Sequence, residues 1–202
     1  NPYVNKKNVL RFYNNDGDDN EQTKLPNYYD IVGRNKMYDA IINEKDTILF
    51  CGHGSGNGCW APNYHYSLNV NTLPYVEAKN IIGVWCHASD FARRYDVPGF
   101  FTYMFISSEA EANFEGIKSV SDKEIKRCEL EFMQKVNQLL KNNVPLDQWV
   151  DKIQNEMLNE NSNEVEQFNY SQLYYNPNKK SQRDDEGYLK SQRAWTDKYW
   201  WI

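Results

Sequence analysis

The stretch TILFCGHGSG, residues 47–56, decides how this chain folds. It starts with five apolar or β-branched residues and then changes at once to glycine and polar residues, a pattern typical of a short buried strand that ends at a loop. The stretch IIGVWCHAS, residues 81–89, has the same form. Because strands of a parallel sheet are covered on both faces and read as nearly continuous apolar runs, we expect the two segments to be neighbouring parallel strands.

Each predicted strand ends at a residue that can do chemistry, His53 in the first and Cys86 in the second. The carboxyl ends of neighbouring parallel strands meet at one edge of the sheet, where the ligands and catalytic groups of open α/β sheets gather. An imidazole beside a thiol can take its proton, and the resulting thiolate attacks carbonyl carbon. The backbone amides of Gly54 and Cys86 are candidate donors to the oxyanion formed in this attack. The two strand ends therefore predict a Cys–His dyad.

His87 is the alternative base, because it follows Cys86 directly. Successive side chains of an extended strand point to opposite faces, so His87 faces away from Cys86 as long as the strand continues through both residues. A turn that begins at Cys86 would remove this restriction. We interpret His53 as the base and keep His87 as the alternative.

The rest of the chain predicts one α/β domain. Turn residues and apolar spacing favour a strand at 9–13, a helix at 35–43, a loop at 54–71, a strand at 100–106, a helix at 121–141 with a Ser121–Glu124 capping box, a helix at 146–158 and an edge strand at 168–175. We expect a three-layer sandwich with a mainly parallel central sheet and helices on both faces. Residues 1–120 would form the core, and residues 121–202 a helical and aromatic extension packed on the same domain.

Composition excludes several classes of partner. The 202-residue chain has a net charge of −5 and no run of Lys or Arg longer than a pair, which argues against a nucleic-acid partner. It has no apolar stretch close to the roughly 20 residues of a membrane span, so we expect no membrane partner. Four cysteines are too few for a disulfide scaffold, which favours a reducing compartment and a cytoplasmic location.

A metal site is the main alternative use of the cysteines and histidines. Zinc prefers these ligands, and Cys51, Cys59 and His65 lie near the predicted dyad in sequence. Their spacing contains neither a CxxC nor an HxxxH pair. The alternating glycines of residues 52–58 also lack the GxGxxG or Lys-Ser/Thr pattern of phosphate-binding loops. We therefore expect neither a metal nor a cofactor.

These motifs suggest a family. A strand that ends in His-Gly-Ser-Gly, a later strand that ends in Cys, and an expected helix between them resemble the caspase-like cysteine peptidases, which include caspases, gingipains, clostripain, legumains and separase. The resemblance covers about residues 9–116. It implies that His53 is the general base, Cys86 the nucleophile, and Gly54 with Cys86 the oxyanion-hole donors. It also implies that residues 100–111 line the pocket for the substrate residue before the scissile bond.

Polar residues near the strand ends are candidates for substrate binding. The candidates are Asp90, Ser107, Ser108 and Glu109. Glu109, Glu111 or Asp90 would accept charge-assisted hydrogen bonds from a substrate Arg or Lys, although a solvated surface carboxylate is the simpler interpretation of any one of them. Arg93 and Arg94 would instead suit an acidic substrate residue.

The sequence as a whole favours a cysteine endopeptidase that acts on a peptide or protein through a thioester and cleaves after a basic residue. The alternative is a catalytically inactive caspase-like module that binds or scaffolds, because a fold does not guarantee activity.

Overall fold

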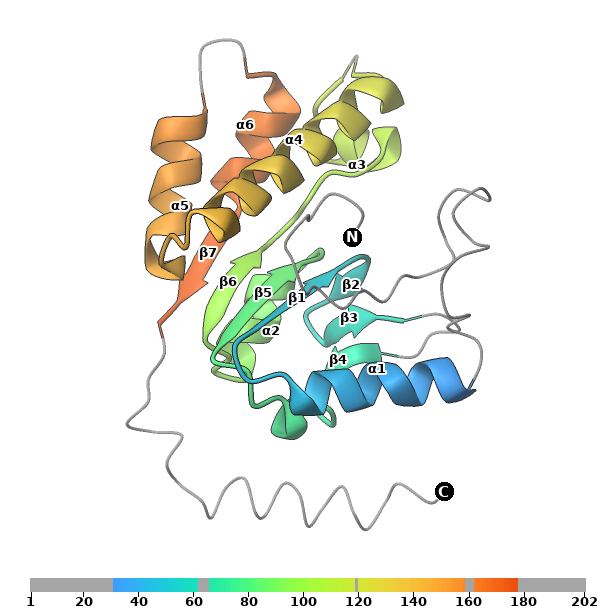
Figure 1. Ribbon diagram of the computed structural model, residues 1–202. Helices are drawn as coiled ribbons and strands as arrows, with labels where there is room; N and C mark the ends of the chain where they lie inside the picture. Colours follow the sequence, from blue (N-terminus) through green and yellow to red (C-terminus); the bar gives the residue numbers. More distant parts are fainter. Residues whose placement is uncertain (1–30, 62–65, 119, 159–161, 178–202) are drawn as a thin grey trace.

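The computed structural model describes residues 31–61, 66–118, 120–158 and 162–177 (Figure 1). Its centre is a mixed four-stranded sheet with the strand order β1-β5-β6-β7. The bounds are β1 Thr47–Cys51, β5 Asn80–Val84, β6 Gly99–Thr102 and β7 Leu173–Asn176. The first three strands are parallel, and β7 runs antiparallel to β6. The expected α/β class is confirmed, and the sheet carries one antiparallel strand.

The two strands predicted from the apolar runs are both present, and they are neighbours. In their parallel register, Cys51 is the partner of Val84. The pairing continues one step further, since the Gly52 N–H donates to the Val84 carbonyl oxygen at 3.0 Å. The strands therefore end level with each other at one edge of the sheet.

Helices cover both faces of this sheet (Figure 1). Six α-helices lie in the described residues: α1 Ile31–Asn43, α2 Ala88–Arg94, α3 Glu109–Phe114, α4 Asp122–Lys141, α5 Trp149–Asp151 and α6 Glu164–Ser171. None of the described helices is both long enough and apolar enough to cross a bilayer.

Alternate strand residues enter two cores, because successive side chains of a strand point to opposite faces. Ile82, Val84 and Phe100 pack with side chains of α4, α5 and α6. On the opposite face, Phe50, Ile81 and Phe101 pack with side chains of α1 and α2. Residues from the second half of the chain thus build one of the two cores around the same sheet.

The segment expected to be a loop forms a second, three-stranded antiparallel sheet. Its strands are β2 Gly54–Ser55, β3 Gly58–Trp60 and β4 Tyr66–Asn69. The prediction of a helix between the His and Cys strands was wrong for the described residues. In these residues the small sheet and a 3-10 turn at Leu73–Tyr75 make the connection. Cys59 and Leu68 are buried against the α1 and α2 core, and this burial outweighs the polar composition of the segment.

The strand expected at 100–106 is shorter than predicted. β6 ends at Thr102, and its pairing with β5 ends at Phe101. The next carbonyl, that of Tyr103, accepts a hydrogen bond from the His87 N–H. Phe105 and Ile106 are buried, but they pack against the helices that cover the sheet. These two residues are therefore buried by packing against helices and not as part of a strand.

The second half of the chain contains one confirmed helix and two revised elements. α4 begins with the expected capping box of Ser121 and Glu124. The helix expected at 146–158 is a 3-10 turn, the short α5 and a π-helical turn at Lys152–Met157. The edge strand expected at 168–175 was partly wrong, because α6 takes its first half and β7 begins only at Leu173. The expected strand 9–13 and the aromatic terminus 195–202 lie outside the described residues.

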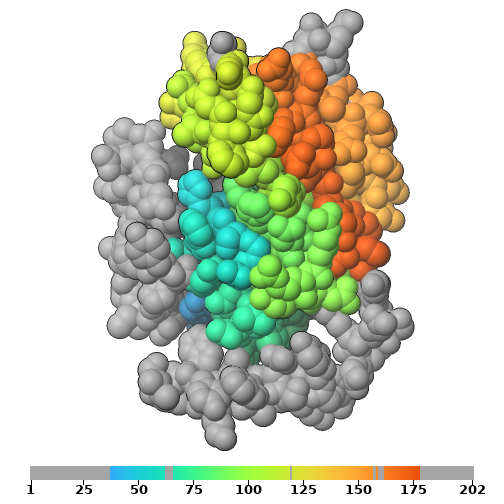
Figure 2. Space-filling view, turned by 180° about the vertical axis from the view of Figure 1, so that it is seen from behind, coloured from blue at the N-terminus to red at the C-terminus, as the bar shows by residue number. Residues whose placement is uncertain are grey.

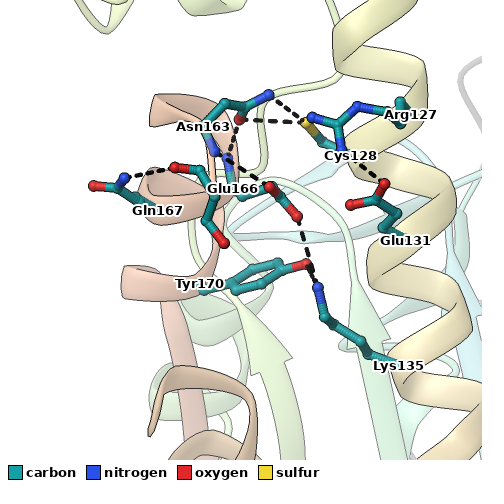
Figure 3. Close-up of polar contacts among 9 residues, drawn as sticks. Arg127, Cys128, Glu131, Lys135, Asn163, Glu166, Gln167 and Tyr170 are labelled. Carbon is teal, nitrogen blue, oxygen red and sulfur yellow. Dashed lines mark hydrogen bonds and ion pairs between the residues drawn. The ribbon is translucent and has the colours of Figure 1, made fainter. Parts of the chain in front are cut away.

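A buried polar network attaches α6 to α4 (Figure 3). The Lys135 ammonium donates to the Tyr170 hydroxyl at 2.8 Å and lies 3.6 Å from the Glu166 carboxylate, which is almost fully buried. One turn away, the Asn163 amide exchanges hydrogen bonds with the Cys128 thiol. Burial and the charge of Glu166 raise the pKa of the Tyr170 phenol, so it stays a neutral donor and acceptor. The charges of Lys135 and Glu166 are paired with each other, and the network fixes α6 against α4.

Candidate active site

The sheet register brings the two sequence-predicted residues to one edge. Cys51 and Val84 are paired, and His53 and Cys86 each lie two residues further along neighbouring parallel strands. Both side chains therefore belong to loops that leave the sheet at the same end. In the space-filling view from behind, the residues of β2 and β3 lie next to those of α2, which begins two residues after Cys86 (Figure 2).

His53 lies on the surface at the start of the small sheet. Its carbonyl oxygen accepts a hydrogen bond from the Trp60 N–H at 2.8 Å, so these two residues form a hydrogen-bonded antiparallel pair. Such pairs alternate with non-hydrogen-bonded ones, and the next pair is Gly54 with Cys59. The Gly54 N–H consequently points away from β3.

Gly54 has a packing reason to be glycine. A Cβ there would overlap the Trp85 indole and come within 2.6 Å of the Gly58 carbonyl oxygen. The indole is buried, and its Nε1 donates to the Ser55 carbonyl at 3.1 Å. Gly83 leaves space for the same ring, since a Cβ there would lie 2.6 Å from the Phe101 ring and as close to the indole. The Trp85 side chain thus packs against the loop that carries His53 and holds this loop at the end of β5.

Cys86 is half-buried, and its thiol points to the chain after β6. The Sγ donates to the Phe105 carbonyl oxygen at 3.6 Å. Burial raises the pKa of this thiol, and the charge of Glu111 raises it further. The resting form is therefore the thiol, and a base must take its proton before attack.

His87 does not follow the strand geometry expected for it. β5 ends at Val84, and His87 adopts a left-handed conformation with φ 65° at the start of α2. The alternation that would turn it away from Cys86 therefore does not apply. Its Nδ1 lies 3.0 Å from the Asp90 carboxylate, and its ring meets the edge of the Tyr103 ring. Because a carboxylate accepts hydrogen bonds, Nδ1 donates in this contact.

The predicted substrate-binding residues have partners within the protein. Ser108 caps α3 by accepting from the Glu111 N–H at 3.3 Å. Ser107 donates from its N–H and its hydroxyl to the Glu111 carboxylate, at 2.7 and 2.9 Å. Glu109 and Asp122 each accept from the other's backbone N–H, which joins α3 to the start of α4. Asp90 holds His87, so the structure gives all four a local contact.

Glu129 is the carboxylate that sequence reasoning missed as part of the site, whereas Glu111 was already among the candidates for substrate binding. The charge of Glu111 acts on both the Cys86 thiol and the Glu129 carboxyl. Burial raises the pKa of Glu129 to about 7, and repulsion from Glu111 adds to this, while Lys126 lowers it. The signal in the sequence was the position of Glu129 among apolar residues on the inner face of α4.

The other three cysteines lie in different environments. None of the four cysteines forms a disulfide; Cys51 is exposed, and Cys59 and Cys128 are buried. Burial raises the pKa of Cys59 to about 12, which leaves it a thiol under ordinary conditions. Across the part of the chain that the structure describes, no three His, Cys, Asp or Glu side chains gather as a metal site. His65, considered as a ligand above, lies outside that part.

Comparison with known proteins adds no relative. No family model, no curated protein and no solved structure matches this chain. The class of the site therefore rests on its residues: a surface imidazole and a half-buried thiol at the level ends of two neighbouring parallel strands.

Proposed function

We propose that this protein is a cysteine endopeptidase of caspase-like architecture, with Cys86 as nucleophile and His53 as general base. The observation that carries the proposal is the parallel register of β1 and β5, in which both residues lie two positions beyond the pair Cys51 and Val84. A base and a thiol at one edge of an α/β sheet form the arrangement that nucleophilic catalysis needs.

The proposed reaction follows from these groups. His53 takes the proton of the Cys86 thiol, and the sulfur forms a bond with the scissile carbonyl carbon. The N–H groups of Gly54 and Cys86 donate to the oxyanion. The imidazolium then protonates the leaving amine, and the C–N bond breaks to leave a thioester. Water, deprotonated by His53, attacks the thioester, releases the acid and restores the thiol.

A basic residue before the scissile bond fits the charges near the thiol. Glu111 carries a charge that reaches Cys86, and Glu129 lies close enough to respond to it. A substrate Arg or Lys would neutralise these carboxylates through charge-assisted hydrogen bonds. A positional scan of peptide substrates tests this preference, which a preference for Asp or Asn would contradict.

Labelling and turnover test the dyad together. An acyloxymethyl ketone peptide should modify Cys86, as read by mass spectrometry, and Cys86→Ala should abolish both labelling and peptide cleavage. Cys51→Ala is the matched control, because Cys51 is an exposed cysteine at the end of the neighbouring strand. Modification of Cys59 or Cys128 with Cys86 untouched would overturn the nucleophilic role.

Two histidine variants identify the base. His53→Ala should reduce turnover by about 100-fold or more, as expected for loss of a general base. His87→Ala should leave most of the turnover, because the proposal assigns the proton of Cys86 to His53 and gives His87 no part in the reaction. The reverse result would assign the base to His87.

An inactive binding or scaffolding module is the second candidate. The observation that favours it is the raised pKa of the Cys86 thiol, which disfavours the thiolate. This candidate predicts that no member of a peptide library is cleaved and that Cys86→Ala changes nothing in partner binding. Cleavage that depends on Cys86 excludes it.

A further inference from the structure

The chain leaves the sheet after β6 and is then held by one side chain of α6. Asn169 is 1% exposed. Its Oδ1 accepts from the Ile106 N–H at 2.7 Å, and its Nδ2 donates to the Ile106 carbonyl at 3.2 Å. A neighbouring strand would make this same pair of bonds to one residue. The amide of Asn169 therefore replaces the missing strand at this position.

The peptide unit held by Asn169 also faces the thiol. The Ile106 N–H and the Phe105 carbonyl belong to one planar peptide group, and in a trans peptide they point in opposite directions. The N–H points to Asn169, and the carbonyl oxygen lies 3.6 Å from the Cys86 Sγ. Fixing the N–H therefore fixes the direction of the carbonyl that contacts the sulfur.

The same segment is fastened at its other end by the loop of Cys86. The His87 N–H donates to the Tyr103 carbonyl, and the Thr102 hydroxyl donates to the Trp85 carbonyl at 2.8 Å. On the far side, α6 is held by the network of Lys135, Glu166 and Tyr170 (Figure 3). Asn169 precedes Tyr170 directly, so its amide has a rigid support.

We propose that Asn169 is a positioning residue for Cys86: through the Phe105–Ile106 peptide group, it fixes the Phe105 carbonyl that contacts the thiol. The inference deepens the proposed function, and only its turnover arm rests on that function.

The test measures how the rate of Cys86 alkylation by iodoacetamide depends on pH, with mass spectrometry to identify the modified residue. Asn169→Ala removes both bonds without burying a charge, and Asn169→Asp removes only the donated one. Asn169→Ala should expose the thiol to water and lower its pKa, whereas Asn169→Asp keeps the acceptor for the Ile106 N–H and should lower the pKa less. A decrease of about one unit would make alkylation at pH 7 about tenfold faster. Peptide turnover should decrease in the same variants.

Asn176→Ala is the matched control. Asn176 is also buried, and its Nδ2 donates to the carbonyls of Val97 and Ala92, at 2.8 and 3.5 Å, away from the thiol. It should lower the melting temperature but leave the alkylation profile of Cys86 unchanged. Glu111, the charged group that acts on the thiol from α3, is present in every variant.

The outcomes separate the two ideas. An unchanged alkylation profile in Asn169→Ala, or an equal change in Asn176→Ala, overturns the positioning role. A shifted profile in the Asn169 variants supports it, even if the wild-type protein cleaves no peptide. In that last case the proposed endopeptidase function fails, while the role of Asn169 stands.

Discussion

The Thr102 hydroxyl donates a hydrogen bond of 2.8 Å to the carbonyl oxygen of Trp85, between the end of β6 and the residue after β5. Thr102 is fully buried, so water cannot replace this donor. The bond joins the two strands at the edge where Cys86 lies, and it keeps their ends together once the strand pairing has stopped at Phe101.

Thr102→Val removes this bond with little change in shape. The Trp85 carbonyl would keep only the bond from the Ala88 N–H, so the loss of one hydrogen bond should cost about 0.5 to 1.5 kcal/mol in the free energy of unfolding. Urea unfolding checks this value. Thr102→Ser keeps the hydroxyl and is the control. A valine variant as stable as the wild type would show that the bond contributes nothing.

Gly54→Ala should destabilise the protein more than Gly56→Ala. A Cβ at Gly54 would overlap the Trp85 indole, whereas one at Gly56 would lie 3.3 Å from the Asp90 Cβ and 3.8 Å from the Arg94 Nη2. Overpacking of this kind costs about 1 to 3 kcal/mol. Thermal unfolding followed by circular dichroism compares the two variants, and equal melting temperatures would contradict the packing of Trp85 on Gly54.

Glu129→Gln should make stability less dependent on pH. The pKa of Glu129 is raised to about 7 in the folded protein, above its unfolded value of 4.5. Between these values the folded state binds the extra proton, so stability falls as pH rises through this window. The Gln variant should match the wild type near pH 5.

Above pH 7 the same variant should be more stable, by about 1 kcal/mol once solvent screening of the partly exposed carboxyl is allowed for. Urea unfolding at pH 5 and pH 8 measures the difference. An advantage at pH 5 that disappears at pH 8 would have the opposite sign and would contradict the assignment.

Lys135→Met should be strongly destabilising because it leaves the buried Glu166 carboxylate without its ammonium partner. Removal of one partner from a buried pair costs about 3 to 5 kcal/mol. Glu166→Gln in the same chain removes the stranded charge and should restore part of the loss. A double-mutant cycle measures the coupling, and additive single effects would mean that Lys135 and Glu166 do not interact.

The strands and helices found from the sequence are those whose pattern is local. The apolar runs of β1 and β5 are continuous, and the capping box of α4 lies within four residues, so each can be recognised without its neighbours. The strands of the second sheet have only two to four residues, too few for an alternation to be seen against glycine and asparagine.

The edge of the candidate site was predictable, but its interior was not. His53 and Cys86 follow their strands directly, so parallel pairing alone brings them to one end of the sheet. Glu111 and Glu129 meet only because α3 packs beside α4, and Asn169 reaches Ile106 across 63 positions. Such contacts arise from tertiary packing, which no single stretch of sequence encodes.

Gly54, Gly83 and Trp85 share one volume, since the indole fills the space that both glycines leave. A side chain at either glycine is therefore acceptable only together with a smaller residue at position 85. In related sequences the residues at these three positions should therefore change together. Their joint pattern would identify the loop that carries His53 even where the surrounding sequence is no longer similar.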